Sequence, residues 1–157
     1  MEIWAVLAPL VKVLIYVLSF LVVGTAMFIL HFRSLLSAPT YSYCSKLVSR
    51  SSLAGSIVAP LLLLMTAGNI GGNLQSAVDP IMINIALLSK AGQSVLVLFF
   101  GFLIVFFWIY FFHKQIFTLG ALGIALILLS FSLYGHSTIS GFSSQSLIVL
   151  HLGAISF

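Results

Sequence analysis

Residues 95–112 read VLVLFFGFLIVFFWIYFF, a stretch without a single charged side chain. A helix needs about 20 mostly apolar residues to cross the ~30 Å hydrocarbon layer of a bilayer, where only helices and closed barrels satisfy their backbone hydrogen bonds. The rest of the 157-residue chain shares this character, because 62% of its residues are hydrophobic and 5% are charged. Ordinary soluble domains are roughly 45–50% apolar and about 25% charged. We therefore expect lipid, rather than water, to surround most of these side chains.

Three further apolar stretches are long enough to cross a bilayer, and one more is not. Together with residues 95–112, the predicted spans cover residues 4–30, 53–70 and 116–134. A fifth apolar run, residues 146–157, would reach only about 18 Å at 1.5 Å per residue. The expected fold is all-α: a single polytopic transmembrane helix bundle over residues 1–157, with four full spans and a truncated fifth. The abrupt end of the fifth run favours a fragment or split gene product, with a half-inserted re-entrant helix as the alternative.

The segments between the spans are predicted from their polar residues and helix signals. Residues 34–52 form the most polar stretch and are expected to be a loop. Asp79 followed by Pro80 is typical of a helix start and predicts a helix over residues 81–89 along the outer surface. Gly92 is expected to provide the bend into the third span. The N-terminus lacks the basic region and cleavage site of a signal peptide, so we expect the first span to be retained.

The basic residues predict the orientation of the bundle. Arg33, Lys46 and Arg50 follow the first span, and Lys114 follows the third. Because cytoplasmic loops are enriched in Lys and Arg, we expect both connections to face the cytoplasm and the N-terminus to lie outside.

Other lysines and the overall charge bear on possible partners. Lys12 lies inside the first span and Lys90 just before the third, where each can extend its charged group to an interface on an apolar stem. The net charge of +4 comes from scattered residues, so nucleic acid is not expected as a partner.

The sequence offers little for conventional catalysis. It contains two acidic residues in total, and it has no phosphate-binding glycine loop, nucleophile elbow or zinc-protease motif. We therefore expect the protein not to be an enzyme.

The four histidines are the informative set, because imidazole is a common ligand of metals and haem iron. By predicted depth they form two pairs. His136 and His151 lie towards the outer side, and His31 and His113 lie towards the cytoplasmic side. For the cytoplasmic pair, an interfacial position beside a basic residue is the more probable interpretation. His151 lies within an apolar helix, where a buried imidazole needs a partner.

Two methionines are predicted to lie on the same side as the outer histidine pair. Met65 is near the outer end of the second predicted span, and Met82 is in the surface segment. Thioethers suit Cu(I), and imidazole suits several copper states. The sequence therefore indicates a copper site formed by His136 and His151, joined by Met65 and Met82. Simple packing of either methionine is the alternative.

Several short motifs, taken in order, carry a resemblance to a known family. They are Lys12, Tyr16 and Gly24 in the first span, the Asp79 segment leading to Ser89-Lys90-Ala91-Gly92, Gly135-His136-Ser137, and Leu150-His151-Leu152. In this pattern the chain resembles the N-terminal half of the copper resistance protein D family. The resemblance implies an inner-membrane protein of about eight spans for copper uptake or resistance. It also implies copper contacts at His136 and His151, a small periplasmic copper-binding partner, and a C-terminal half that is missing here.

Two functions from different classes are thus predicted. The first is a copper-handling or copper-transport protein of the inner (plasma) membrane. The alternative is a b-type haem protein in electron transfer or porphyrin oxidation, in which one or both histidine pairs supply axial ligands.

Overall fold

The computed structural model describes residues 3–112, 117–133 and 142–156. All regular structure in these ranges is helical. The helices are α1 (Ile3–Phe32), α2 (Ala38–Gly71), η1 (Gln75–Ala77), α3 (Pro80–Leu88), α4 (Lys90–Phe107), the π-helical turn η2 (Trp108–Phe112), α5 (Phe117–Ser132) and α6 (Phe142–Ser156). The expected all-α class is confirmed.

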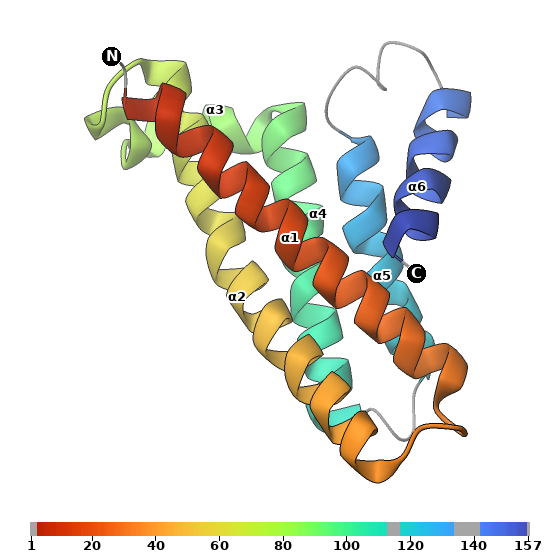
Figure 1. The fold of residues 1–157 in the computed structure, drawn as a ribbon. Helices are drawn as coiled ribbons and strands as arrows, with labels where there is room; N and C mark the ends of the chain where they lie inside the picture. Colours follow the sequence, from red (N-terminus) through yellow and green to blue (C-terminus); the bar gives the residue numbers. More distant parts are fainter. Residues whose placement is uncertain (1–2, 113–116, 134–141, 157) are drawn as a thin grey trace.

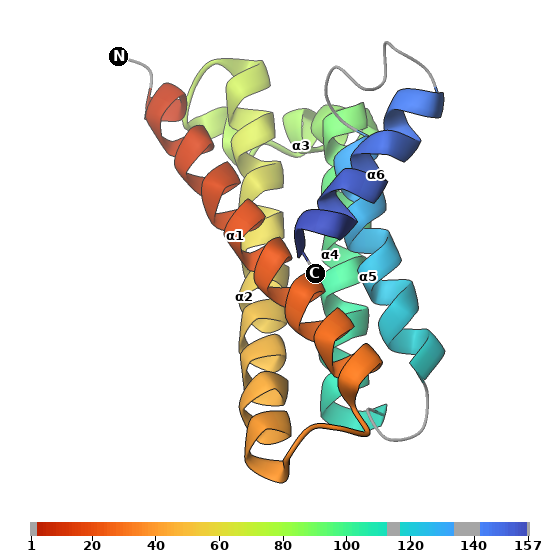
Figure 2. The same ribbon diagram turned by 45° about the vertical axis from the view of Figure 1, so that its right-hand side comes forward.

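Four long helices are arranged so that each packs mainly on the next. α1 packs against α2, α2 against α4, and α4 against α5, with a lighter contact between α5 and α1. α6 lies along α5 and ends about midway along the bundle, where the backbone of Ser156 meets Gly24 of α1 (Figures 1 and 2). We call the end of the bundle with η1 and α3 the Asp79 end, and the end with residues 33–37 the Arg33 end.

Three helices are long and apolar enough to cross a membrane, judged by length and composition. They lie at Val6–Phe32, Ala38–Gly71 and Lys90–Phe111. α5 corresponds to the fourth predicted span but has 16 residues, and α6 has 15. The structure thus supports a helical membrane bundle, with three helices of clear spanning length.

The expectation of a loop over residues 34–52 is wrong for most of its length. α2 begins at Ala38, where the side chain of Ser37 accepts a hydrogen bond from the backbone N–H of Thr40 and Pro39 occupies the first turn. The Ser52 hydroxyl is buried but donates to the Val48 carbonyl at 2.7 Å. Because a serine in a helix can satisfy its hydroxyl on its own backbone, a serine-rich segment remains helical and packs tightly.

The helix predicted after Asp79 is confirmed, and the bend that follows it lies at Ser89 rather than at the predicted Gly92. Asp79 caps α3 by accepting from the Ile81 N–H at 2.9 Å. The chain turns at Ser89, whose extended backbone both ends α3 and caps α4, rather than at Gly92. Gly92 has a different role: its missing side chain lets the first turn of α4 approach the Ala86 carbonyl.

The core is densest from the middle of the bundle towards the Arg33 end. Phe102 of α4 and Trp108 of η2 are fully buried, and each ring lies against a glycine, Gly55 for Phe102 and Gly120 for Trp108. The backbones of α4 and α5 also meet closely at Gly101 and Gly123. Small residues allow such close approach between membrane helices.

Candidate functional site

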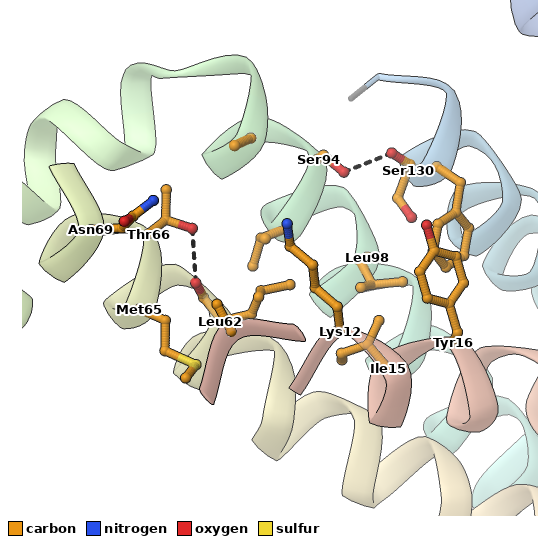
Figure 3. Close-up of a pocket in the computed structure, with 14 residues that line it drawn as sticks. Lys12, Ile15, Tyr16, Leu62, Met65, Thr66, Asn69, Ser94, Leu98 and Ser130 are labelled. Atoms are coloured by element: carbon orange, nitrogen blue, oxygen red, sulfur yellow. Dashed lines mark hydrogen bonds between the residues drawn. The ribbon is translucent and has the colours of Figure 1, made fainter. Parts of the chain in front are cut away.

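A pocket of about 200 Å³ lies between α1, α2, α4 and α5 in the half of the bundle nearer the Asp79 end. Figure 3 shows its lining side chains entering from these helices. The polar lining residues are Lys12 and Tyr16 of α1, Thr66 and Asn69 of α2, Ser94 of α4, and Ser130 of α5; Met65 lines it as well. A cavity of about 150 Å³ holds a benzene molecule, so this pocket is large enough for a small ligand or several waters.

Lys12 is the one charged residue among those that line the pocket. Figure 3 shows its side chain extending from α1 into the space between α2 and α4. One turn further along α1, the Tyr16 ring stacks on Phe131 of α5 with centroids 5.0 Å apart. This stacking contributes to the light contact between α1 and α5 and closes one side of the pocket.

Three hydroxyl groups in the pocket donate their protons to backbone carbonyls. Thr66 donates to Leu62 at 2.9 Å, and Ser130 donates to Ile127 at 2.7 Å, each within its own helix. Ser94 donates to the Ser130 carbonyl at 2.6 Å and so joins α4 to α5. A hydroxyl has one proton and two lone pairs. The three oxygens therefore present acceptor capacity, and no further proton, to the pocket.

Of the residues predicted to bind copper, Met65 alone lines this pocket among those the structure describes. Met65 is 9% exposed and packs with Ala77 and Val11. Met82 is half-buried on α3, where its Cγ lies 3.5 Å from the position a side-chain carbon on Gly71 would take. His151 is exposed on α6. His136 lies outside the described residues.

The described residues include no cluster of three or more His, Cys, Asp or Glu side chains that could hold a metal ion. His31, which belongs to the predicted cytoplasmic pair, lines a different cavity at the Arg33 end, together with Arg33 and Phe117. In this cavity the Arg33 guanidinium lies 4.9 Å from the centroid of the Phe117 ring. The proposed partner of His31, His113, lies outside the described residues. The histidine and methionine assignments therefore remain predictions.

Lys12 is a functional candidate that the sequence analysis assigns to no site. The expected extension of its charged group to an interface stays a prediction, and the structure shows that Lys12 is exposed and lines the pocket. Two signals pointed to it: an ionisable residue within an apolar span is a functional candidate by default, and Tyr16 follows it at the spacing of one helical turn.

The fold and pocket define a class: a helical protein with three helices able to cross a membrane and a polar pocket between them. Comparison with protein families identifies the family. Residues 1–144 match the model described as copper resistance protein D-like, N-terminal domain. The chain belongs to this family, which confirms the resemblance found in the motifs. No curated protein and no solved structure matches the chain.

Proposed function

We propose that this chain is a non-enzymatic membrane protein that handles copper, in transport or resistance, at the inner (plasma) membrane. The observation that carries the proposal is the family match over residues 1–144 in a chain with three helices of spanning length. In this proposal α5 forms a fourth span, because residues 116–134 are mostly apolar and carry no charged side chain. α6 begins at the Asp79 end (Figure 1).

The proposed copper ligands are His136 and His151, with Met65 and Met82 as further soft donors. Support comes from chemistry, because imidazole and thioether groups are suited to copper. Support also comes from placement. α3 carries Met82 and lies at the Asp79 end, and α6 carries His151 and begins at the same end (Figure 1). The pocket that Met65 lines is in the same half of the bundle. An exposed His151 is accessible to an incoming ion.

The proposed orientation puts the Asp79 end outside. Arg33, Lys46 and Arg50 follow α1 at the opposite end of the bundle, and such residues are retained in the cytoplasm. Copper would then arrive from the periplasmic side, and a small periplasmic copper-binding protein is the partner we propose.

Copper binding by the purified full chain tests the ligands. We expect Cu(I) affinity, measured by competition with a chromophoric chelator, to fall at least tenfold in His151→Ala and in His136→Ala. His31→Ala, at the Arg33 end, is the matched control and should bind as the unmodified protein does. Equal affinity in all four proteins would remove both histidines as ligands. A Soret band in the purified protein that disappears in either outer variant would show haem ligation instead.

A further inference from the structure

The cavity at the Arg33 end of the bundle has a volume of about 430 Å³. It lies where α1 ends and α5 begins, two ends that Figures 1 and 2 show at the same end of the bundle. The lining comes from the last turn of α1, the turn after it and the first residue of α5: Leu30, His31, Arg33, Ser34 and Phe117. Small-molecule sites in proteins have volumes of roughly 300–1,000 Å³. The cavity is therefore large enough for a ligand the size of a lipid headgroup.

The polar groups of this cavity can donate hydrogen bonds, and Arg33 carries a permanent positive charge. Its guanidinium has five N–H donors and no acceptor, and the His31 ring and the Ser34 hydroxyl can each donate as well. The guanidinium is half-buried and lies 4.9 Å from the centroid of the Phe117 ring, so a contact with another helix fixes its position. This arrangement suits a phosphate group, which the planar guanidinium binds through two parallel hydrogen bonds.

The chain supplies no acidic side chain to balance the charge of Arg33. Its two acidic residues are Glu2 and Asp79. Asp79 caps α3 at the opposite end of the bundle (Figure 1). Glu2 directly precedes α1, a helix about 45 Å long at 1.5 Å per residue, and Arg33 follows the other end of that helix. An anion that pairs with Arg33 therefore has to come from outside these 157 residues.

The position and the apolar part of the cavity indicate which molecule provides the anion. The candidate span that ends beside Arg33, Val6–Phe32, has 27 residues. This length corresponds to about 40 Å, which exceeds the ~30 Å hydrocarbon layer, so the residues after it reach the headgroup layer. Leu30 and Phe117 add hydrocarbon surface to the same cavity. A phospholipid has both kinds of group that this lining matches, a phosphate and hydrocarbon.

We propose that this cavity is a binding site for an anionic phospholipid. The lipid phosphate accepts hydrogen bonds from Arg33, and the glycerol and upper acyl chain lie against Leu30 and Phe117. Basic pockets between membrane helices bind anionic headgroups. A zwitterionic lipid fits less well, because Arg33 repels the cation of its headgroup. The site is separate from the proposed copper ligands and requires only that the chain lies in a membrane.

Native mass spectrometry of the purified full chain in detergent measures lipid affinity, with phosphatidylglycerol and phosphatidylcholine of identical acyl chains as probes. We expect phosphatidylglycerol to bind at least fivefold more tightly. Arg33→Gln should remove this preference by lowering the phosphatidylglycerol affinity about fivefold or more, the effect of one basic residue near an anionic lipid surface. Arg50→Gln is the matched control. It removes the same charge from an exposed position on α2 that is not part of the lining, and it should change the affinity less than twofold.

Ser34→Asp tests the same site without removing Arg33. A carboxylate beside the guanidinium competes with the lipid phosphate, so this variant should also lose the preference for phosphatidylglycerol. Ser34→Asn, its uncharged counterpart, should retain the preference. Because Ser34 is exposed, this pair decides the question if Arg33→Gln does not fold, as judged by helical circular dichroism.

Three results overturn the inference: equal binding of the two lipids by the unmodified protein, equal losses in Arg33→Gln and Arg50→Gln, or the same lipid preference in Ser34→Asp and Ser34→Asn. Displacement of phosphatidylglycerol by an excess of inorganic phosphate would assign the cavity to free phosphate and would also overturn the lipid assignment. The proposed function fails on a different measurement, which is normal copper binding by the outer histidine variants.

Discussion

At the scale of single residues, the Ser94 hydroxyl links two helices that otherwise meet through apolar groups and glycines. Its hydrogen bond to the Ser130 carbonyl is 2.6 Å long. We expect Ser94→Ala to lower the free energy of unfolding by about 0.5–1 kcal/mol, since hydrogen bonds between membrane helices contribute on that order. Unfolding in mixed detergent, followed by circular dichroism, measures the change.

Ser56→Ala is the matched control for this hydrogen bond. The Ser56 hydroxyl is also buried, but it donates to the Leu53 carbonyl of its own helix, 2.9 Å away. Its removal breaks no link between helices, so we expect a smaller change. Equal effects of the two substitutions would mean that the contact between α4 and α5 gains nothing from Ser94.

At the scale of helices, the end of α2 depends on the backbone of one glycine. Gly72 has φ of 75°, and its N–H donates a hydrogen bond to the Gly68 carbonyl at the end of the helix. A side-chain carbon at this position would meet nothing within 4 Å, so the effect of a substitution comes from the backbone conformation alone. Gly72→Ala should cost about 1 kcal/mol, and Gly72→Asn less, because Asn adopts this conformation more readily. Chemical unfolding of the two variants compares them, and equal losses would contradict a backbone origin.

The helices also show what the sequence can and cannot predict. Apolar length correctly identified three helices of spanning length, whereas the expected fourth span, residues 116–134, corresponds to the 16-residue helix α5 and is not confirmed. Asp79 followed by Pro80 correctly placed the start of α3. The sequence does not predict the first half of α2, because the polarity of residues 34–52 indicates a loop. The signal that could have found it was Ser37 before Pro39, a cap and first-turn pair like the one at α3.

At the scale of the whole molecule, the pocket could not be predicted because its residues come from four helices. Lys12, Thr66, Ser94 and Ser130 lie far apart in the chain. The positions of polar residues along each helix are visible in the sequence, but the rotation of one helix against another is set by packing, such as the meeting of Gly101 and Gly123. The predicted depth of Met65 along its helix places it in the correct half of the bundle. Depth does not show that Met65 lines the pocket whereas Met82 lies on α3.

The orientation of the whole bundle leads to the last prediction. Residues 33–37 lie at one end and α3 lies at the other (Figure 1). Arg33 is followed by Lys46 and Arg50 in the first half of α2. These basic residues should keep the Arg33 end of the bundle in the cytoplasm, because moving clustered basic residues across the membrane is unfavourable. The one cysteine, Cys44, is buried, so Cys44→Ser gives a background for labelling. In that background, a membrane-impermeant maleimide should label Gln75→Cys in intact cells and Ser34→Cys only after permeabilisation. The reverse pattern would place the Asp79 end, and the proposed copper entry, on the cytoplasmic side.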